Sequence, residues 1–305
     1  MNLKSAFVLL VSLLTLGLAE AQTIDIENIP RPLFRDPVHD GAADPNLIWN
    51  DDTKEWWLFY TQRRANVDTQ GTAWVYGSDI GIGISSDNGK TWRYFGIAEG
   101  LNVEPGHNTF WAPCVRKFGN VYHMFVTYVR GVQFDWRGDG IIAHYTSKNL
   151  WKWKFEGFVP VEKNVIDPTV HELPDGTYGL WYTYNGDTYF ASSSNLKKWI
   201  PAGKPAVTGI NHEAPIVFRM AGYYWMITDP RGDYNGLAVY RSDDASVWTR
   251  MPDLMLGGHA DVAVCGDKAY IVYFRHFEKN GHSRASAIYM SELKVSNGNL
   301  VVSRY

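Results

Sequence analysis

Cysteine is nearly absent from this sequence, since its 305 residues include only Cys114 and Cys265. This number excludes a fold held by several disulfides, and a chain of this length buries enough surface to form a core without them. Each cysteine lies just beyond the start of a repeat unit, and the two units are not neighbours in the predicted fold. We therefore expect two free, buried thiols rather than a bridge.

An excess of basic residues is also missing. Lys and Arg number 29 against 32 Asp and Glu, which gives a formal charge of -3. Nucleic-acid binding needs a basic surface, so a nucleic-acid partner is excluded. Beyond residue 21, no apolar run has the length of a membrane span, so no membrane partner is expected. No linker or low-complexity segment divides residues 22–305, which are expected to form a single domain.

The first 21 residues have the pattern of a signal peptide. Lys4 supplies a positive charge, residues 6–18 are apolar, and Ala19-Glu20-Ala21 has the small residues of a cleavage site. We expect cleavage after Ala21 and a periplasmic or secreted location. No cysteine follows the apolar stretch, which argues against a lipid anchor.

Aromatic residues are abundant, at 15% of the chain with 13 Trp and 18 Tyr. Aromatic side chains pack well in sheets. They also present an apolar face to which the C–H face of a sugar can bind. We expect most of them in the core and a few Trp at a binding site.

A unit of strand, tight turn, apolar strand, third strand and closing Trp recurs along the chain. Its starts are marked by Pro45, Pro113, Pro168 and Pro215, and the fifth start is matched to Val262. The closing tryptophans are Trp92, Trp153, Trp199 and Trp248. Periods of about 40–70 residues with about four strands each are typical of β-propellers. The predicted fold is all-β, a five-bladed β-propeller.

Three of the first four units place an acidic side chain at their start: Asp44, Asp167 and Glu213. The first residues of the inner strands of a propeller converge on its axis, so these acids are expected to meet in one funnel. Carboxyl groups gathered in this way are costly to ionise together, so at least one pKa is expected to be raised. A protonated acid beside an ionised carboxylate is the pair that glycoside hydrolysis requires.

The motifs around these acids resemble those of family 43 glycoside hydrolases, which are five-bladed propellers. Residues 43–48 (Ala-Asp-Pro-Asn-Leu-Ile) are similar to the first-blade motif of that family, and residues 166–170 (Ile-Asp-Pro-Thr-Val) to its third-blade motif. Residues 211–215 (Asn-His-Glu-Ala-Pro), followed by Gly-Tyr-Tyr at 222–224, are similar to the fourth-blade motif. The resemblance covers almost the whole of residues 22–305.

The resemblance implies an inverting hydrolase in which Glu213 is the general acid and Asp44 the general base. Asp167 would orient Glu213 and tune its pKa. The implied substrate is an oligo- or polysaccharide of plants or algae, from which a terminal arabinofuranose, xylose or galactose is removed. No cofactor is required, and we expect a monomer.

The sequence departs from the family pattern at Cys114, where an aspartate is usual, and at Ala214, where a glycine is common. Related propeller families that act on anhydrogalactose or galactofuranose remain open. Asp44-Pro45-Asn46 also resembles the invertase-like propellers, which retain configuration, although their Arg-Asp-Pro motif stands here at residues 35–37 rather than in the middle of the chain. Retaining transfer, phosphorolysis and carbohydrate binding without catalysis are further alternatives. Phosphorolysis would use basic residues on the rim, for which the candidates are Arg63, Arg64, Arg231 and Arg275.

His259 opens the fifth unit after two glycines and is expected to point into the axial channel. The resemblance implies a central histidine that contacts a cation, such as a structural calcium, or an ordered water. Calcium prefers several oxygen ligands, so waters would have to complete its coordination. A hydrogen-bonded structural histidine is the alternative.

Four further residues are candidates for sugar binding. Trp111 is a candidate stacking wall, and His107 precedes it on the same rim. His212 adjoins Glu213, although alternation along a strand would turn it away. Arg275 is a candidate to hydrogen-bond the sugar or Asp167. The loops at residues 63–78 and 130–139 are expected to shape the mouth of the pocket.

Overall fold

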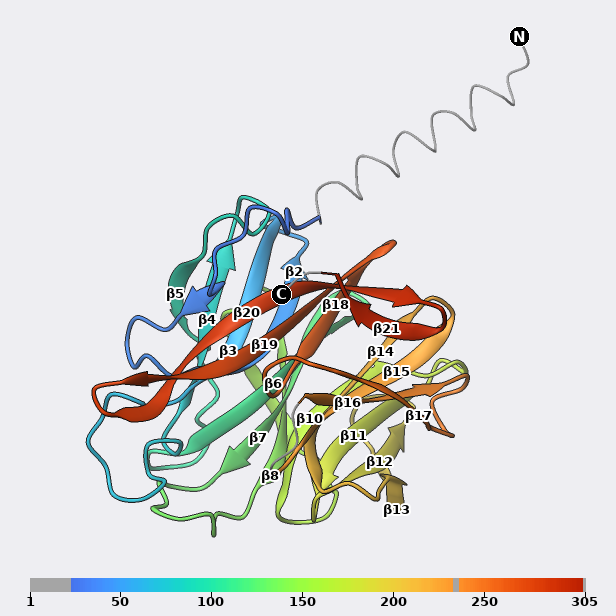
Figure 1. Ribbon diagram of the computed structural model, residues 1–305. Coiled ribbons are helices and arrows are strands. Elements are labelled where there is room, and N and C mark those ends of the chain that lie inside the picture. Colours follow the sequence, from blue (N-terminus) through green and yellow to red (C-terminus); the bar gives the residue numbers. More distant parts are fainter. Residues whose placement is uncertain (1–22, 233–235, 304–305) are drawn as a thin grey trace.

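The computed structural model describes residues 23–232 and 236–303, which form five antiparallel sheets (Figure 1). The predicted five-bladed β-propeller is confirmed. No helix occurs within the described ranges, so none there could cross a membrane. The predicted signal peptide lies outside these residues and stays a prediction.

Four blades each contain four strands that follow one another in the sequence. The first comprises β2 (Ala42–Asn50), β3 (Glu55–Gln62), β4 (Asp79–Ser85) and β5 (Arg93–Ile97). The second comprises β6 (Thr109–Phe118), β7 (Val121–Val129), β8 (Ile141–Ser147) and β9 (Lys154–Phe158). The third comprises β10 (Val165–Glu172), β11 (Tyr178–Tyr184), β12 (Asp187–Ser193) and β13 (Ile200–Val207). The fourth comprises β14 (His212–Met220), β15 (Tyr223–Pro230), β16 (Leu237–Ser242) and β17 (Thr249–Leu254).

The fifth blade joins the two ends of the described chain. Its strands are β18 (Asp261–Cys265), β19 (Lys268–Lys279), β20 (His282–Ser296), β21 (Asn299–Val302) and β1 (Phe34–Arg35). Both β1 and β21 pair with β20, at different points along it. The segment before the first blade is therefore more than an extended lead-in, because it contributes a strand that closes the ring.

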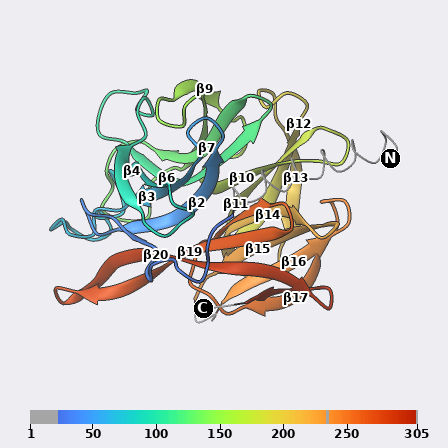
Figure 2. The same ribbon diagram turned by 90° about the horizontal axis from the view of Figure 1, so that it is seen from above.

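The inner strands β2, β6, β10, β14 and β18 contact one another in a closed circle, and Figure 2 shows the blades around them. The closing tryptophans fill the wedges between blades. Trp153 packs on Phe59, Trp199 on Phe125 and Trp248 on Trp181, each in the preceding blade and each edge to face. These three partners occupy the same register position of β3, β7 and β11. These three closing tryptophans therefore pack each blade against the preceding one.

Close packing also explains particular small residues. A side chain at Gly81 on β4 would put its Cβ 2.3 Å from the Tyr60 ring, so this position requires glycine. Cys114 and Cys265 are both free thiols, as expected, although Cys265 is only partly buried. The core therefore depends on apolar packing between blades rather than on covalent links.

Candidate active site

Each inner strand is interrupted at the residues that mark the start of its unit. The pairing of β2, β6, β10 and β14 with the next strand shifts register there. In the four blades, the residue directly before the proline has a left-handed backbone. These residues are Asp44, Ala112, Asp167 and Ala214, with φ of 48°, 50°, 55° and 54°. A left-handed non-glycine residue is strained by roughly 1–2 kcal/mol, so the surrounding structure must hold it.

Hydrogen bonds between blades hold these strained residues. In each case a side chain near the end of one blade's second strand accepts a bond from the backbone N–H of the left-handed residue in the next blade. The pairs are Thr61 with Ala112 (2.9 Å), Thr127 with Asp167 (2.9 Å), Thr183 with Ala214 (3.1 Å) and Asp229 with His259 (2.9 Å). The starts of the second, third, fourth and fifth blades are thus each positioned by the preceding blade.

This geometry corrects the sequence alignment of the units in two places. Asp44 and Asp167 hold the left-handed position, but Glu213 precedes it by one residue and corresponds to Trp111 and Ile166 instead. In the fifth blade, the left-handed residue is His259 with φ of 42°. Ala260, rather than Val262, therefore matches the prolines.

Asp44 is buried and has two cationic neighbours. Arg63 donates from Nη2 to both carboxylate oxygens at 2.8 and 3.1 Å, and His259 Nδ1 lies 3.3 Å from Oδ1. Burial by itself would raise the pKa of Asp44, but Arg63, His259 and a hydrogen bond from Thr61 together lower it below its ordinary value. Asp44 is therefore a carboxylate that stays ionised.

Asp167 has the opposite electrostatics. Burial, together with the negative charges of Glu213 and Asp44, raises the pKa of Asp167 to about 7, against the opposing effect of His259. Its Oδ2 accepts the backbone N–H of Ala214 at 3.2 Å, which ties it to the residue after Glu213. Asp167 therefore retains a proton near neutral pH, as the sequence led us to expect of at least one acid.

Glu213 is the most exposed of the three acids and pairs with Arg231, whose Nε lies 2.9 Å from Oε2. Arg231 Nη2 donates to the same oxygen. Across the strand pair, Glu213 lies opposite Asp229, whose pKa is raised by burial and by the charges of Glu213 and Asp44. Four carboxyl groups therefore gather around His259, balanced by two arginines.

His259 is buried at the centre of this group. Burial would lower its pKa, but the charges of Asp44, Asp167, Glu213 and Asp229 raise it. A protonated imidazole has no lone pair for a metal, and within residues 23–232 and 236–303 no three His, Cys, Asp or Glu side chains are gathered as metal ligands. The residues around His259 thus fit a structural histidine better than a protein-ligated cation.

Asp44, Asp167 and Glu213 line a single cavity of about 900 Å³ together with His259, Arg63 and Arg231. The lining includes an aromatic wall and amide groups that can bond hydroxyls. The aromatic wall comprises Trp74, Tyr76, Trp111, Trp136 and Phe274, and the amides belong to Asn164, Asn185 and Asn211.

Of the four predicted sugar-binding residues, only Trp111 lines this cavity, where its Nε1 donates to the Val75 carbonyl at 2.7 Å. His212 is fully buried and bonds Thr188 at 2.7 Å, which agrees with its turning away from Glu213. His107 is exposed beside Gly77, outside the cavity. Arg275 lies over the rings of two tyrosines on the outer part of its blade and contacts neither the cavity nor Asp167.

Several site residues were not anticipated in these roles. Arg63 and Arg231 were candidates for phosphate binding, whereas here they pair with the acids. Asp229 was missed, although it takes the place that Thr61, Thr127 and Thr183 hold in other blades. Trp136 belongs to a loop that was identified only as shaping the mouth. Asp229 could have been identified from its position at the end of the second strand of its blade, whereas no sequence pattern indicated Trp136.

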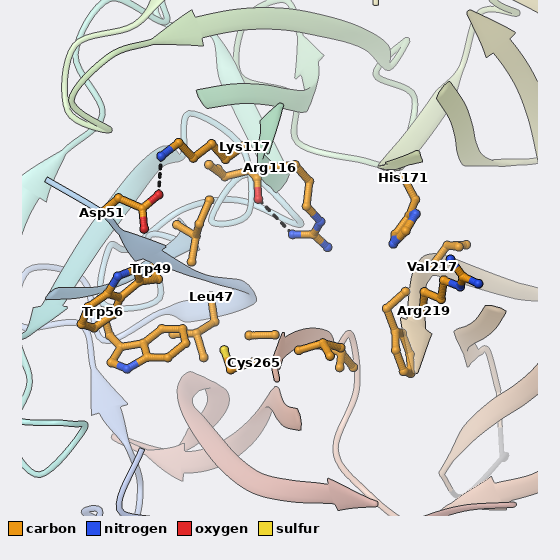
Figure 3. A pocket seen from close by; sticks show the side chains of 16 residues that line it. Leu47, Trp49, Asp51, Trp56, Arg116, Lys117, His171, Val217, Arg219 and Cys265 are labelled. Carbon is orange, nitrogen blue, oxygen red and sulfur yellow. Dashed lines mark hydrogen bonds and ion pairs between the residues drawn. The ribbon is translucent and has the colours of Figure 1, made fainter. Parts of the chain in front are cut away.

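The opposite end of the inner strands carries a second hollow of about 350 Å³ (Figure 3). Arg116, His171 and Arg219 surround it, and Asp51 on its wall pairs with Lys117. Arg116 is itself bonded to Asp261 at 2.6 Å. Acid–base chemistry is favoured in the first cavity rather than here, because the first cavity brings a carboxyl with a raised pKa, Asp167, together with an ionised carboxylate, Asp44.

Comparison with known proteins gives matches among solved structures only. No family model matches the chain, and no curated protein matches its sequence. A family-43 enzyme from Xanthomonas citri in complex with xylotriose is 15% identical with a TM-score of 0.69, covering 92% of this chain and 95% of that one. An exo-1,5-α-L-arabinanase from a bovine ruminal metagenomic library is 17% identical with a TM-score of 0.63, covering 89% and 99%.

A family-43 β-1,3-galactosidase in complex with galactodeoxynojirimycin is 15% identical with a TM-score of 0.66, covering 87% of this chain and 95% of that one. Identities this low establish the shared fold alone. The resemblance to family 43 that the sequence motifs indicated is therefore confirmed at the level of the five-bladed propeller.

Proposed function

We propose that this chain is an inverting glycoside hydrolase that removes a terminal arabinofuranose, xylose or galactose from an oligo- or polysaccharide of plants or algae. One observation carries the proposal: a single cavity brings together a carboxylate held ionised, Asp44, and a carboxyl held protonated near neutral pH, Asp167, with Glu213 beside them. Environments that push the pKa values of neighbouring carboxyl groups apart are characteristic of acid–base pairs.

In the proposed reaction, Asp44 removes a proton from a water molecule as that water attacks the anomeric carbon. Glu213 protonates the glycosidic oxygen as the bond to the leaving group breaks. Asp167, whose pKa is raised to about 7, holds Glu213 in position and keeps a proton available to it for delivery. Inversion follows from a single displacement on the face opposite the leaving group.

Arg231 has a defined part in this scheme. In the free protein it pairs with Glu213, so it stabilises the ionised form of the acid. Proton delivery leaves Glu213 ionised again, and Arg231 is placed to receive that charge. The Arg231–Glu213 pair therefore stabilises the ionised Glu213 that is present after proton delivery. Asp167 favours the protonated Glu213 that is needed before it.

The arginines that suggested phosphorolysis are otherwise engaged. Arg63 and Arg231 bond the acids, and Arg64 donates to the carbonyls of Tyr76 at 2.8 Å and Ala73 at 2.6 Å. Arg275 lies outside the cavity. No specific observation therefore favours phosphate as the attacking group.

Three sequence-based proposals accompany the function. Residues 1–21 direct the protein to the periplasm or the medium, the protein acts as a monomer, and no cofactor is needed. A structural calcium bound near His259 would need ligands from water, because the neighbouring carboxylates of Asp44 and Asp229 already bond the protein.

The experiment is a screen of the purified protein against nitrophenyl arabinofuranoside, xyloside and galactosides. Glu213→Gln serves as the matched control, since its amide oxygen can still accept a bond from Arg231. We expect release of nitrophenol from at least one substrate by the unmodified protein and none by the variant. Equal activity in both would overturn the assignment of Glu213, and no release from any glycoside or oligosaccharide would overturn the function.

A further inference from the structure

A line of aromatic rings leads from the acids to the mouth of the cavity. The Trp111 and Tyr76 ring centroids lie 4.8 Å apart, and those of Tyr76 and Trp136 lie 6.3 Å apart. Tyr76 is fully buried, whereas the Trp136 side chain is 70% exposed. The line therefore ends in an indole ring that faces solvent at the rim.

The position of Trp136 is fixed by contacts between two loops that are far apart in the sequence. The backbone N–H of Thr72 donates to the Phe134 carbonyl at 3.0 Å. A side chain at Gly71 would put its Cβ 2.2 Å from that same carbonyl oxygen, so the loops approach each other as closely as glycine permits. Trp136 is thus part of a preformed wall, and little ordering is needed when it binds a ligand.

The loop at residues 63–78 is held in turn by Arg64, which bonds the carbonyls on both sides of Trp74 and Val75. Tyr76 packs with Val75 and Val129 in a small apolar cluster that Trp74 and Trp111 extend. The aromatic wall therefore has its own core, separate from the wedges between blades. A wall supported in this way can present an exposed ring in a fixed orientation.

The two kinds of lining residue suit the two kinds of surface on a sugar. The C–H face of a furanose or pyranose can stack on an indole, and its hydroxyls can bond the amides of Asn164, Asn185 and Asn211 that line the same cavity. The volume of about 900 Å³ is near the upper end of the range for small-molecule sites (~300–1,000 Å³). The cavity thus has room for more than the one sugar that reacts at the acids.

We propose that Trp136 is the stacking platform for the second sugar of the substrate, on the leaving-group side of the cleaved bond. This rests on the proposed function, since exo action places the terminal sugar at Asp44 and Glu213 and directs the next unit toward the rim. The substrate is then a chain of at least two sugars rather than a glycoside of a small alcohol. Trp136 acts on specificity and takes no part in proton transfer.

The test compares Trp136→Ala with the unmodified protein on two matched substrates, a disaccharide and the methyl glycoside of the same sugar. The pairs are xylobiose with methyl xyloside, arabinobiose with methyl arabinofuranoside, and galactobiose with methyl galactoside. A stacking contact contributes about 0.5–1.5 kcal/mol, so the loss of kcat/KM on the disaccharide should exceed that on the methyl glycoside by roughly two- to twelvefold. Trp136→Phe should recover most of the difference.

Phe134→Ala is the control, because Phe134 is an exposed aromatic residue of the same loop that does not line the cavity. Phe134→Ala should leave kcat/KM unchanged on both the disaccharide and the methyl glycoside. Equal losses on both substrates in Trp136→Ala, or a loss on neither, would overturn the proposal for Trp136 and leave the hydrolase intact.

A binding measurement separates this proposal from the proposed reaction. In the Glu213→Gln background, titration calorimetry with the disaccharide should show binding that Trp136→Ala weakens by a similar factor. Binding of the free monosaccharide should change less. If the protein cleaves no substrate and Trp136 nevertheless strengthens disaccharide binding, the proposed reaction is wrong and the stacking role of Trp136 is supported. If Trp136→Ala leaves disaccharide binding unchanged, the platform fails whatever the activity.

Discussion

Arg63 bonds both carboxylate oxygens of Asp44 through a single Nη2, and the pair is almost entirely removed from water. Such a pair keeps Asp44 ionised although burial opposes ionisation. The cation also lies over the Phe274 ring, 5.0 Å from its centroid, so its position is fixed by packing as well as by charge. Arg63 is thus the main neighbour that keeps the proposed base ionised, with His259 and Thr61 contributing in the same direction.

Replacing Arg63 by Met should therefore raise the pKa of Asp44 and move the acid limb of kcat/KM to higher pH, because the protonated base is inactive. Leaving a buried charge without its partner also costs about 3–5 kcal/mol of folding free energy. The checks are a pH–rate profile and urea unfolding. Arg63→Lys should restore much of the original acid limb and of the unfolding free energy. An unchanged acid limb in Arg63→Met would contradict the proposal that Arg63 keeps Asp44 ionised.

Asp167→Asn tests the carboxyl with the raised pKa. Because the folded-state pKa of Asp167 is raised to about 7, its contribution to stability is present below the ordinary aspartate value and is lost as the pH rises through about 7. The Asn variant has no carboxyl to ionise, so it does not lose this stability at high pH, and its amide oxygen can still accept a hydrogen bond from the Ala214 N–H. Thermal unfolding should show the variant gaining stability over the unmodified protein at pH 8 relative to pH 4. A pH-independent difference would contradict the shift.

The same variant should alter the alkaline limb of activity. Asp167 is the carboxyl whose raised pKa keeps a proton at the site, and a neutral amide in its place cannot hold that proton. We expect the alkaline limb of kcat/KM to move to lower pH by about one unit or more. An unmoved limb would show that Asp167 does not keep the delivered proton at the site.

Asp44→Asn and Glu213→Gln should each lower kcat by about 10²–10⁴-fold, the range that general acid–base assistance contributes. Both replacements keep the shape of the side chain, so circular dichroism should change little. The melting temperature should change little for the partly exposed Glu213 but should fall for Asp44→Asn, which leaves Arg63 and His259 without their carboxylate. Turnover is measured with the substrate found in the screen. A variant that retains full kcat would remove its residue from the mechanism.

Asp229 offers a test of the hydrogen bonds between blades. Asp229→Thr introduces the residue that the other blades use at this point and should keep an acceptor for the His259 N–H. Asp229→Ala leaves that buried N–H without a partner and should cost about 1–3 kcal/mol of unfolding free energy. Chemical denaturation of both variants measures the difference. Equal stabilities would mean that the acceptor does not hold His259.

The fold was predictable because the prolines at the start of four blades mark a left-handed residue in the inner strand. They follow the left-handed residues Asp44, Ala112, Asp167 and Ala214, where the strand pairing breaks. In the fifth blade, Ala260 replaces the proline, and the alignment slipped by two residues to Val262. The β1 strand was missed because two residues that pair with a strand more than 250 positions away leave no local pattern.

The acids were predictable from their motifs, but their partners were not. Arg63 and Arg231 lie 19 and 18 residues beyond Asp44 and Glu213, on the far side of hairpins whose turn lengths differ. Without the register of β2 with β3 and of β14 with β15, sequence cannot say which arginine faces which acid. Trp136 depends on a contact between two irregular loops, which hydrophobic periodicity does not encode.

The central claim is that these acids cleave a glycosidic bond by a single displacement in which Asp44 activates water. Proton NMR of the first sugar released, recorded before its anomers equilibrate, tests this most directly. The account predicts an anomeric configuration opposite to that of the substrate. A product with the configuration retained would contradict it, because Asp44 would then be the nucleophile rather than the base.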